Sequence, residues 1–154
     1  AMAAGLSVEP HRLSELAEWL DRELGRKVAA AGAHQSMPLD LSLLPRGLNT
    51  DLVTALEQAG PYGMGWPGPR VAVGPVRVVK TDIVGTDHVR LIVAGDDGGR
   101  LKAIGFRMAE SDLGQALLHG SAGRKLWLAG RAKIDDWGSQ PAVELHLEDA
   151  AFAD

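Results

Sequence analysis

The nine-residue segment PYGMGWPGP, residues 61–69, decides how this chain is divided. The segment holds three prolines and three glycines. Proline fixes φ and lacks a backbone donor, while glycine readily takes φ > 0, so neither a helix nor a regular strand is expected to run through it. Before the segment the apolar residues recur with a helical period, and after it mostly with a period of two. We therefore predict a rigid connector between a helical part and a β part. Its Tyr62, Met64 and Trp66 are expected to pack on a domain surface, with contact of Tyr62 or Trp66 to a ligand as the alternative.

Length and composition limit the class of protein. A chain of 154 residues fits one or two small domains. No apolar run approaches the roughly 18 residues of a membrane span, and no signal peptide opens the chain. Without cysteine there is neither a disulfide framework nor a thiolate metal site, which fits a cytoplasmic protein with no membrane partner. The first residue is Ala1 rather than methionine, which suggests a segment of a longer protein.

The residues before the connector predict helices. Pro10 suits a first helical turn, and an apolar stripe then recurs at helical spacing as far as Leu24. This helix is expected to end at Gly25 or Gly32. Three shorter features are also expected: a strand at 6–8, an extended segment at 39–41 and a second helix capped by Asn49 or Thr50.

After the connector, five runs with a period of two predict five strands, and a short helix over 110–118 separates the third from the fourth. That order is typical of an OB-fold, a small five-stranded barrel, with another small barrel or a half-open sheet as the alternative. The predicted fold class is mainly β with N-terminal helices (α+β): an OB-fold barrel preceded by a small helical segment. The predicted strands are residues 76–84, 88–94, 100–106, 125–136 and 141–147.

Two aromatic residues of the predicted strands are expected in the core. Trp127 alternates with Leu126 and Leu128, so one of these two faces lies inside, and we predict that it is the Trp127 face. Phe106 is predicted to be a core residue as well. Trp137 lies at the turn between the last two strands, where OB-folds carry a ligand-binding loop, or it packs on the barrel rim.

Charge is distributed unevenly along the chain. The net charge is −4, yet residues 70–107 carry seven Lys/Arg against four Asp/Glu, a net charge of +3. Residues 1–69 are net −3 and residues 108–154 net −4. A local basic stripe matters more for phosphate binding than the total charge does, so the first strands are the candidate for contact with nucleic acid. Alternatively, the basic residues of this block form an ordinary solvent-exposed strand face that binds no nucleic acid.

No catalytic motif is visible in the sequence. The five histidines are scattered over separate predicted elements, and there is no HExxH, phosphate-binding loop or nucleophile elbow. Asp96-Asp97 and Asp135-Asp136 are expected to be solvated acids of a turn and a strand end rather than cation ligands. We therefore predict that this segment is not an enzyme by itself and holds no cofactor.

Four segments resemble motifs of one family. The start AMAAGL, residues 1–6, resembles the end of the Gly-Gly-His-x-x-Ala-Ala-Gly motif of the DHH-associated domain in DHH phosphoesterases. Residues 61–69 resemble the Pro-Phe-Gly-x-Gly-Asn-Pro-x-Pro signature of the RecJ family, bacterial exonucleases specific for single-stranded DNA. Residues 101–106, LKAIGF, resemble its Leu-x-Ala-Ile-x-Phe strand, and residues 134–149 resemble its closing Ile-Asn-Glu-Trp-x-Gly hairpin. The matches follow the family's order along the whole chain.

The sequence also departs from the family pattern. Tyr62 replaces Phe, Trp66 stands where Asn is usual, and Glu144 stands where Gln is usual. Only the end of the first motif is present, with Ala4 and Gly5 as its remnant, and the metal-binding motifs of the DHH domain are absent. The resemblance thus implies a C-terminal piece of a RecJ-like protein, in which Mn²⁺ or Mg²⁺ serves the parent enzyme. It implies three parts: the end of the DHH-associated domain at 1–35, a helical connector at 36–69 and an OB-fold domain at 70–154.

The resemblance implies that the barrel handles single-stranded DNA. The parent family cleaves single strands in the 5′→3′ direction in DNA repair and recombination, and the barrel is expected to guide a strand to the DHH catalytic domain. OB-folds bind single strands through a basic groove and stacking aromatics, and because aromatics are few here we expect the electrostatic contribution to be larger. The predicted DNA-binding residues are Arg77, Arg90, Lys102, Arg107, Arg131, Lys133 and Trp137.

A second hypothesis treats the β part as a docking module. The acidic block at 108–154 fits a protein partner better than DNA. In this reading the barrel docks on the DHH catalytic domain of its own full-length chain, or on a single-strand-binding protein, and does not contact DNA.

Overall fold

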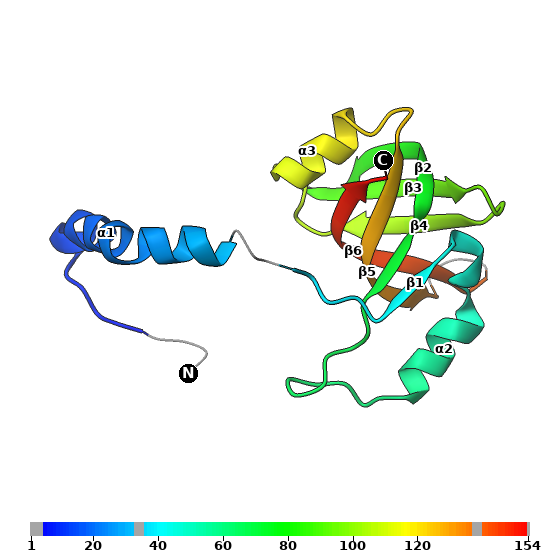
Figure 1. Cartoon of the computed structure of the whole chain (residues 1–154), viewed down its shortest axis with the longest axis horizontal. Coiled ribbons are helices and arrows are strands. Elements are labelled where there is room, and N and C mark those ends of the chain that lie inside the picture. The colour runs from blue at the N-terminus through cyan, green and yellow to red at the C-terminus, as the bar shows by residue number, and fades with distance from the viewer. Residues whose placement is uncertain (1–4, 33–35, 137–139, 154) are drawn as a thin grey trace. The chain divides into compact units, whose positions relative to one another are not determined.

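The longest strand, β2 (Val71–Val84), follows the connector and organises the β part (Figure 1). The computed structural model describes residues 5–32, 36–136 and 140–153. Within them, β2 pairs parallel with the short strand β1 (Leu41–Leu43) and antiparallel with both β3 (His88–Gly95) and β5 (Lys125–Asp135). The pairing of β2 with β5, the last strand of the sheet order, is what closes the sheet on itself.

Two further strands complete the closure. β4 (Arg100–Gly105) pairs antiparallel with β3 and parallel with β6 (Ala142–Phe152), and β6 returns antiparallel to β5. The sheet order is β1-β2-β3-β4-β6-β5, with β5 also bonded to β2. The result is a closed barrel of five strands with β1 as an additional strand. This confirms the predicted OB-fold.

The strand alternation places aliphatic side chains inside the barrel. Along β3 buried and partly exposed residues alternate without a break, as expected for strands with one face on a core. Burial of such side chains stabilises the fold by about 1.5–3 kcal/mol each. Twelve residues of the core cluster have at most 2% of their surface exposed: Val53, Val71, Val73, Val76, Val89, Leu91, Val93, Ala103, Leu117, Leu126, Leu128 and Leu145.

Two helices cover opposite ends of the barrel (Figure 1). α3 (Asp112–His119) stands between β4 and β5, is capped by Ser111, and contributes Leu117 to the core. α2 (Thr50–Gln58) is capped by Asn49, whose side chain accepts a hydrogen bond from the Leu52 amide, as the sequence predicts. Val53 of α2 joins the core cluster, and the helix contacts β5 and β6.

The connector packs on this unit through Tyr62. The Tyr62 hydroxyl donates to the carbonyl oxygen of Leu56, and its ring lies edge-to-face with Trp66 at 5.5 Å between centroids. Gly63 and Trp66 exchange backbone hydrogen bonds of 2.9 and 3.2 Å, which close a tight turn. Met64 and Trp66 are 86% and 60% exposed, so the prediction that they pack on a domain surface is wrong.

The two predicted aromatic core residues lie outside the core. Leu126 and Leu128 fill the barrel, and the half-buried Trp127 lies on the opposite face, against Gly74. A Cβ at Gly74 would lie 2.9 Å from the Trp127 ring, so glycine allows this close packing. Phe106 is 50% exposed. Both predictions chose the wrong face of their strands.

Several predicted boundaries differ from the structure. Residues 6–8 form no strand, and the early extended segment is β1, two residues later than predicted. β2 begins at Val71 rather than Val76, and β6 runs on to Phe152. The first helix passes through Gly25 and ends at Gly32, the second of the two predicted ends.

The chain forms two compact units, Ala1–Met37 and Pro38–Asp154. The first contains a 3₁₀ turn, η1 (Pro10–Arg12), that leads into α1 (Leu13–Gly32). The second holds the barrel together with β1, the 3₁₀ turn η2 (Pro45–Gly47), α2 and the connector. The three-part division at 35 and 69 stays a prediction. Among the described residues no helix is long and apolar enough to span a membrane.

Candidate nucleic-acid interface

Alternate residues of β3, β4 and β6 point away from the core and form one surface, here called the outer face. It consists of His88, Arg90, Ile92, Arg100, Lys102, Ile104, Glu144 and His146. Strand register arranges these side chains, with those of β5, in cross-strand rows. One row is Arg90, Ile104, His146 and Arg131, and the next is Ile92, Lys102, Glu144 and Lys133. The barrel therefore brings four of the predicted DNA-binding cations onto neighbouring strands.

Arg90 is held by a carboxylate of the adjacent strand. Its Nε lies 2.9 Å from Oδ1 of Asp82 and its Nη2 lies 2.5 Å from Oδ2, a two-point pair. Lys80 Nζ lies 3.0 Å from the same carboxylate. Hydrogen bonds from Arg90 and then Lys80 keep the pKa of Asp82 well below its ordinary value, and the same pair raises the pKa of Arg90. Two cations thus share one anion here.

Lys102 lies between two carboxylates. Its ammonium group pairs with Asp135 of β5, and its Nζ is 2.7 Å from Oε2 of Glu144. Hydrogen bonds to Asp135 and then to Glu144 raise the pKa of Lys102. Glu144 is only 8% exposed and also lies 3.4 Å from Nε2 of His146. The charge of Lys102 is therefore balanced within the protein.

The two cations of β5 are paired as well. Arg131 Nη1 lies 2.8 Å from Oε1 of Glu148, whose other oxygen accepts a hydrogen bond of 2.5 Å from Arg70. Arg131 also donates to the carbonyl oxygen of Gly68 at 3.3 Å, which ties the end of the connector to the barrel. Lys133 Nζ is 3.6 Å from Oε1 of Glu57 in α2.

The remaining predicted residues lie apart from this group. Arg77 is on β2 and pairs with Asp96 at 2.9 Å, next to the β3–β4 turn. Arg107 is in the turn after β4, with a positive φ of 53° and no ion pair among the described residues. Trp137 and Ala4 lie outside the described residues. Gly5 belongs to the N-terminal unit and makes no close contact.

A groove crosses one end of the outer face. It has a volume of about 430 Å³ and runs between the start of α2 and strands β3, β4 and β6. Arg100 lines it and, like Arg107, has no ion pair within the described part of the chain. The residues that line the groove are Leu48, Asn49, Thr50, Ile92, Arg100, Leu101, Lys102, Ala142 and Val143.

Sequence reasoning missed an aromatic cluster at the other end of the outer face. The Phe106 ring lies edge-to-face with His88 at 5.2 Å and with His146 at 5.0 Å between centroids. The sequence contains a signal for this position of Phe106: it follows Lys102 and Ile104 with a period of two, so it shares their outward face. Leu101 and Ala103 are the core residues of this strand.

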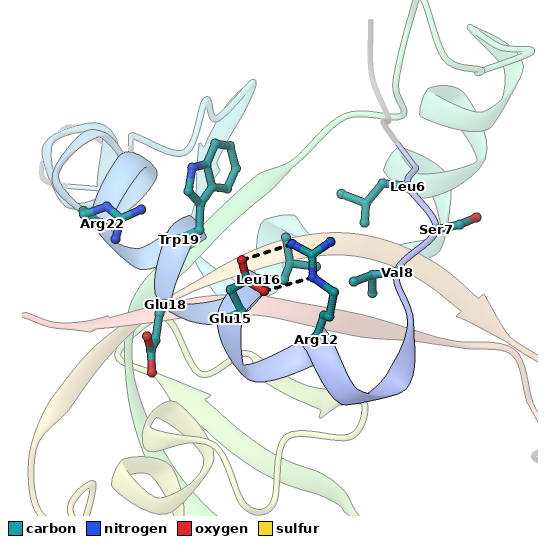
Figure 2. Close-up of a pocket in the computed structure, with 9 residues that line it drawn as sticks. All are labelled: Leu6, Ser7, Val8, Arg12, Glu15, Leu16, Glu18, Trp19 and Arg22. Carbon is teal, nitrogen blue, oxygen red and sulfur yellow. Dashed lines mark hydrogen bonds and ion pairs between the residues drawn. The ribbon is translucent and has the colours of Figure 1, made fainter.

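A second groove of about 430 Å³ belongs to the N-terminal unit (Figure 2). Leu6, Ser7 and Val8 form one side, and residues of η1 and α1 form the other. Arg12 donates to Glu15 at 2.9 and 3.0 Å, a pair that lies exposed to solvent. The lining has no nucleophile with an adjacent base and no group of convergent carboxylates.

No group of three or more His, Asp or Glu side chains within the described ranges is arranged to hold a metal ion. No described residue of the barrel is therefore assigned to the Mn²⁺ or Mg²⁺ that the family resemblance implies for the parent enzyme. The outer face can bind a ligand through charge and through apolar contact, because it presents cations, two imidazoles and, at its edge, the Phe106 ring.

A closed five-stranded barrel with a helix between its third and fourth strands is an OB-type domain, a class that binds oligonucleotides and oligosaccharides on the face of its second and third strands. Those strands are β3 and β4 here. The family model of the RecJ OB domain matches residues 39–149 of the chain. This chain belongs to that family.

Curated relatives are similar along nearly the whole chain. The single-stranded-DNA-specific exonuclease RecJ of Escherichia coli (strain K12) is 27% identical over 157 residues, which cover 96% of this chain and 25% of that protein. The Bacillus subtilis (strain 168) protein of the same name is 21% identical over 155 residues, covering 99% and 19%. The chain thus spans about a quarter or less of the length of these relatives.

A solved structure shares the fold. The crystal structure of RecJ in complex with Mn²⁺ from Thermus thermophilus superposes with a TM-score of 0.53 at 20% identity, over 89% of this chain and 20% of that one.

The lowered pKa of Asp82 predicts a dependence of stability on acid. Because the folded-state pKa lies below the ordinary 3.8, the carboxylate stabilises the fold above that pH, and the contribution is lost as pH falls further. Asp82→Asn is expected to lower the urea midpoint near neutral pH, with a difference from the wild type that shrinks as pH falls below about 4. Asp149→Asn is the control, since this exposed acid has no cation partner among the described residues. A difference for Asp82→Asn that is constant with pH would contradict the assignment.

Proposed function

We propose that this chain is the region of a RecJ-like 5′→3′ exonuclease that binds single-stranded DNA and guides it toward the catalytic DHH domain. The parent enzyme would act in DNA repair and recombination, with Mn²⁺ or Mg²⁺ bound by its DHH domain. Family membership supports the proposal, and so do the RecJ relatives that are named as specific for single-stranded DNA.

The observation that carries the proposal is the position of the cations. Arg90, Arg100 and Lys102 project from the second and third barrel strands, the face on which OB-folds bind oligonucleotides. Arg107 follows on the adjoining turn. Arg100 and Arg107 have no carboxylate partner among the described residues, so they are available to phosphates at no cost in broken ion pairs.

The internal ion pairs suggest that binding is moderate in strength and sensitive to salt. A phosphate that approaches Arg90, Lys102 or Arg131 competes with a carboxylate already in contact with that cation. Such competition lowers the electrostatic contribution of each cation without removing it. Moderate binding of this kind suits an exonuclease, because the DNA strand must move through the enzyme as nucleotides are removed from it.

Arg100 and Arg107, which have no ion pair among the described residues, allow a direct test of this interface. Replacing Arg100 and Arg107 together by alanine is expected to weaken binding of a labelled single-stranded oligonucleotide, measured by fluorescence anisotropy at several salt concentrations. The slope of log K against log salt should become shallower by about 1.4, since each lost phosphate contact on a single strand contributes about 0.7. Arg124→Ala serves as the control, because Arg124 stacks on the Phe152 ring at 3.2 Å and is not an outer-face residue. An unchanged affinity and slope in the double variant would disprove this interface.

One substitution is expected to strengthen binding of the single-stranded oligonucleotide. Asp82→Asn releases Arg90 and Lys80 from their shared carboxylate, so affinity for the single strand should rise and the salt slope should steepen by up to about 1.4. Asp149→Asn makes the same change in net charge but releases no cation. If both variants bind equally, the effect comes from net charge alone and the ion pair does not control binding.

The exposed connector turn favours a second candidate function, a docking module. Met64 and Trp66 are presented on a turn closed by two backbone hydrogen bonds, and such apolar exposure on a rigid turn is a feature of protein contact sites. In this reading the turn orients the barrel on the DHH catalytic domain or binds a single-strand-binding protein.

The docking reading makes a different prediction. Replacing Met64 and Trp66 together by serine should weaken association with a separately produced catalytic domain of the same full-length protein, measured by calorimetry, at both low and high salt, because apolar contacts are little screened. Binding of the oligonucleotide should not change. Association that is unaffected by the double variant would exclude this turn as the contact.

A further inference from the structure

The aromatic cluster of Phe106, His88 and His146 is built from three separate segments of the barrel. His88 opens β3, Phe106 stands in the turn after β4, and His146 lies in β6. Both imidazoles lie edge-to-face with the phenyl ring, at interplanar angles of 71° and 79°. The phenyl ring is nevertheless 50% exposed, so part of its surface faces solvent.

The turn that carries Phe106 is tethered on both sides. The Arg107 amide donates to Nδ1 of His88 at 3.1 Å, and the Ala109 amide donates to the carbonyl oxygen of Asp87 at 3.0 Å. Arg107 takes a positive φ of 53°, a conformation that non-glycine residues adopt uncommonly and that is frequent at ligand-binding segments. These hydrogen bonds hold the turn against the β2–β3 loop, and the ring itself packs on His88 and His146.

The charges around the ring suit a nucleotide better than an apolar partner. Arg107 is adjacent in sequence and has no carboxylate partner in the described ranges. The neighbouring row of the outer face contains Arg90 and Arg131, with Ile104 between Arg90 and His146 in strand register. Carboxylates lie against the two imidazoles, Asp87 at 2.8 Å from Nδ1 of His88 and Glu144 at 3.4 Å from Nε2 of His146. The exposed ring face offers a base a stacking surface, and the arginines of the same region offer its phosphates a counter-charge.

We propose that the exposed surface of Phe106 stacks on one nucleobase of the bound single strand, with His88 and His146 supporting the ring and Arg107 contacting an adjacent phosphate. Phe106 is then the base-binding residue of a barrel whose other contacts are to phosphates. This inference rests on the function proposed above and adds to it the residue that contacts a base. Such stacking is tolerant of sequence, because every base has an aromatic face.

The experiment compares two ligands of equal charge. A labelled oligothymidylate and an oligomer of the same length that lacks bases are titrated with the 154-residue chain and with Phe106→Ala, Phe106→Leu and Phe106→Trp, by fluorescence anisotropy. Val79→Ala is the control, since Val79 is an apolar outer residue with 56% exposure. Circular dichroism and urea unfolding check that each variant is folded.

The expected result is a loss that depends on the bases. Phe106→Ala should bind oligothymidylate about 5- to 100-fold more weakly than the wild type, in line with the loss of one stacked base. Phe106→Leu keeps an apolar side chain but has no aromatic face, so it should lose a similar amount, whereas Phe106→Trp should retain binding. All variants should bind the base-free oligomer equally, with an unchanged salt slope.

Different results overturn different statements. If wild type and Phe106→Leu bind oligothymidylate equally, or if both ligands lose affinity in parallel, the ring does not stack on a base, while binding of DNA by the barrel stands. If the wild-type chain binds neither oligomer at high micromolar concentration, the proposed function fails and this inference fails with it.

Discussion

The closure of the barrel around β2 is the constraint on which the rest of the structure depends. It pairs with β1, β3 and β5, so its register, which shifts between Val73 and Val76 and between Val78 and Lys80, sets which side of each of these strands faces the core. Once valines and leucines of β2, β3 and β5 point inward, the residues between them must point outward. The side of each strand that faces the core therefore also determines which cations and aromatic rings lie on the outer face.

Charge compensation is the second organising feature of the outer face. Arg90, Lys102 and Arg131 each contact a carboxylate from another strand, and Glu144, which stands where the family pattern has Gln, is one of these partners. The +3 block of the sequence is therefore not a bare basic patch. Among the described residues, Arg100 and Arg107 have no ion pair and the Phe106 ring is half exposed, so these three side chains are open to a ligand.

Much of the fold could be predicted because its signals are local. The Asn49 cap, the turn at Asp96-Asp97 and the alternation of β3 depend on residues a few positions apart, and the structure has each of them. Trp127 alternates with Leu126 and Leu128, which allows either face to lie inside, and the prediction takes the wrong face for Trp127 and for Phe106. The charged residues in phase with them in the same strands, Lys125 and Lys102, already indicated the opposite face.

The sequence by itself determined the order of elements, the five-stranded barrel and the cap of α2, since each arises from period, turn chemistry or a cap within a short segment. Only the tertiary structure decided which cations are neutralised and which rings meet. The partners of these contacts lie far apart in the chain, 33 residues for Lys102 and Asp135 and 78 for Arg70 and Glu148. Such pairs exist only after closure has set the register, because no local pattern relates one strand's carboxylates to another strand's cations.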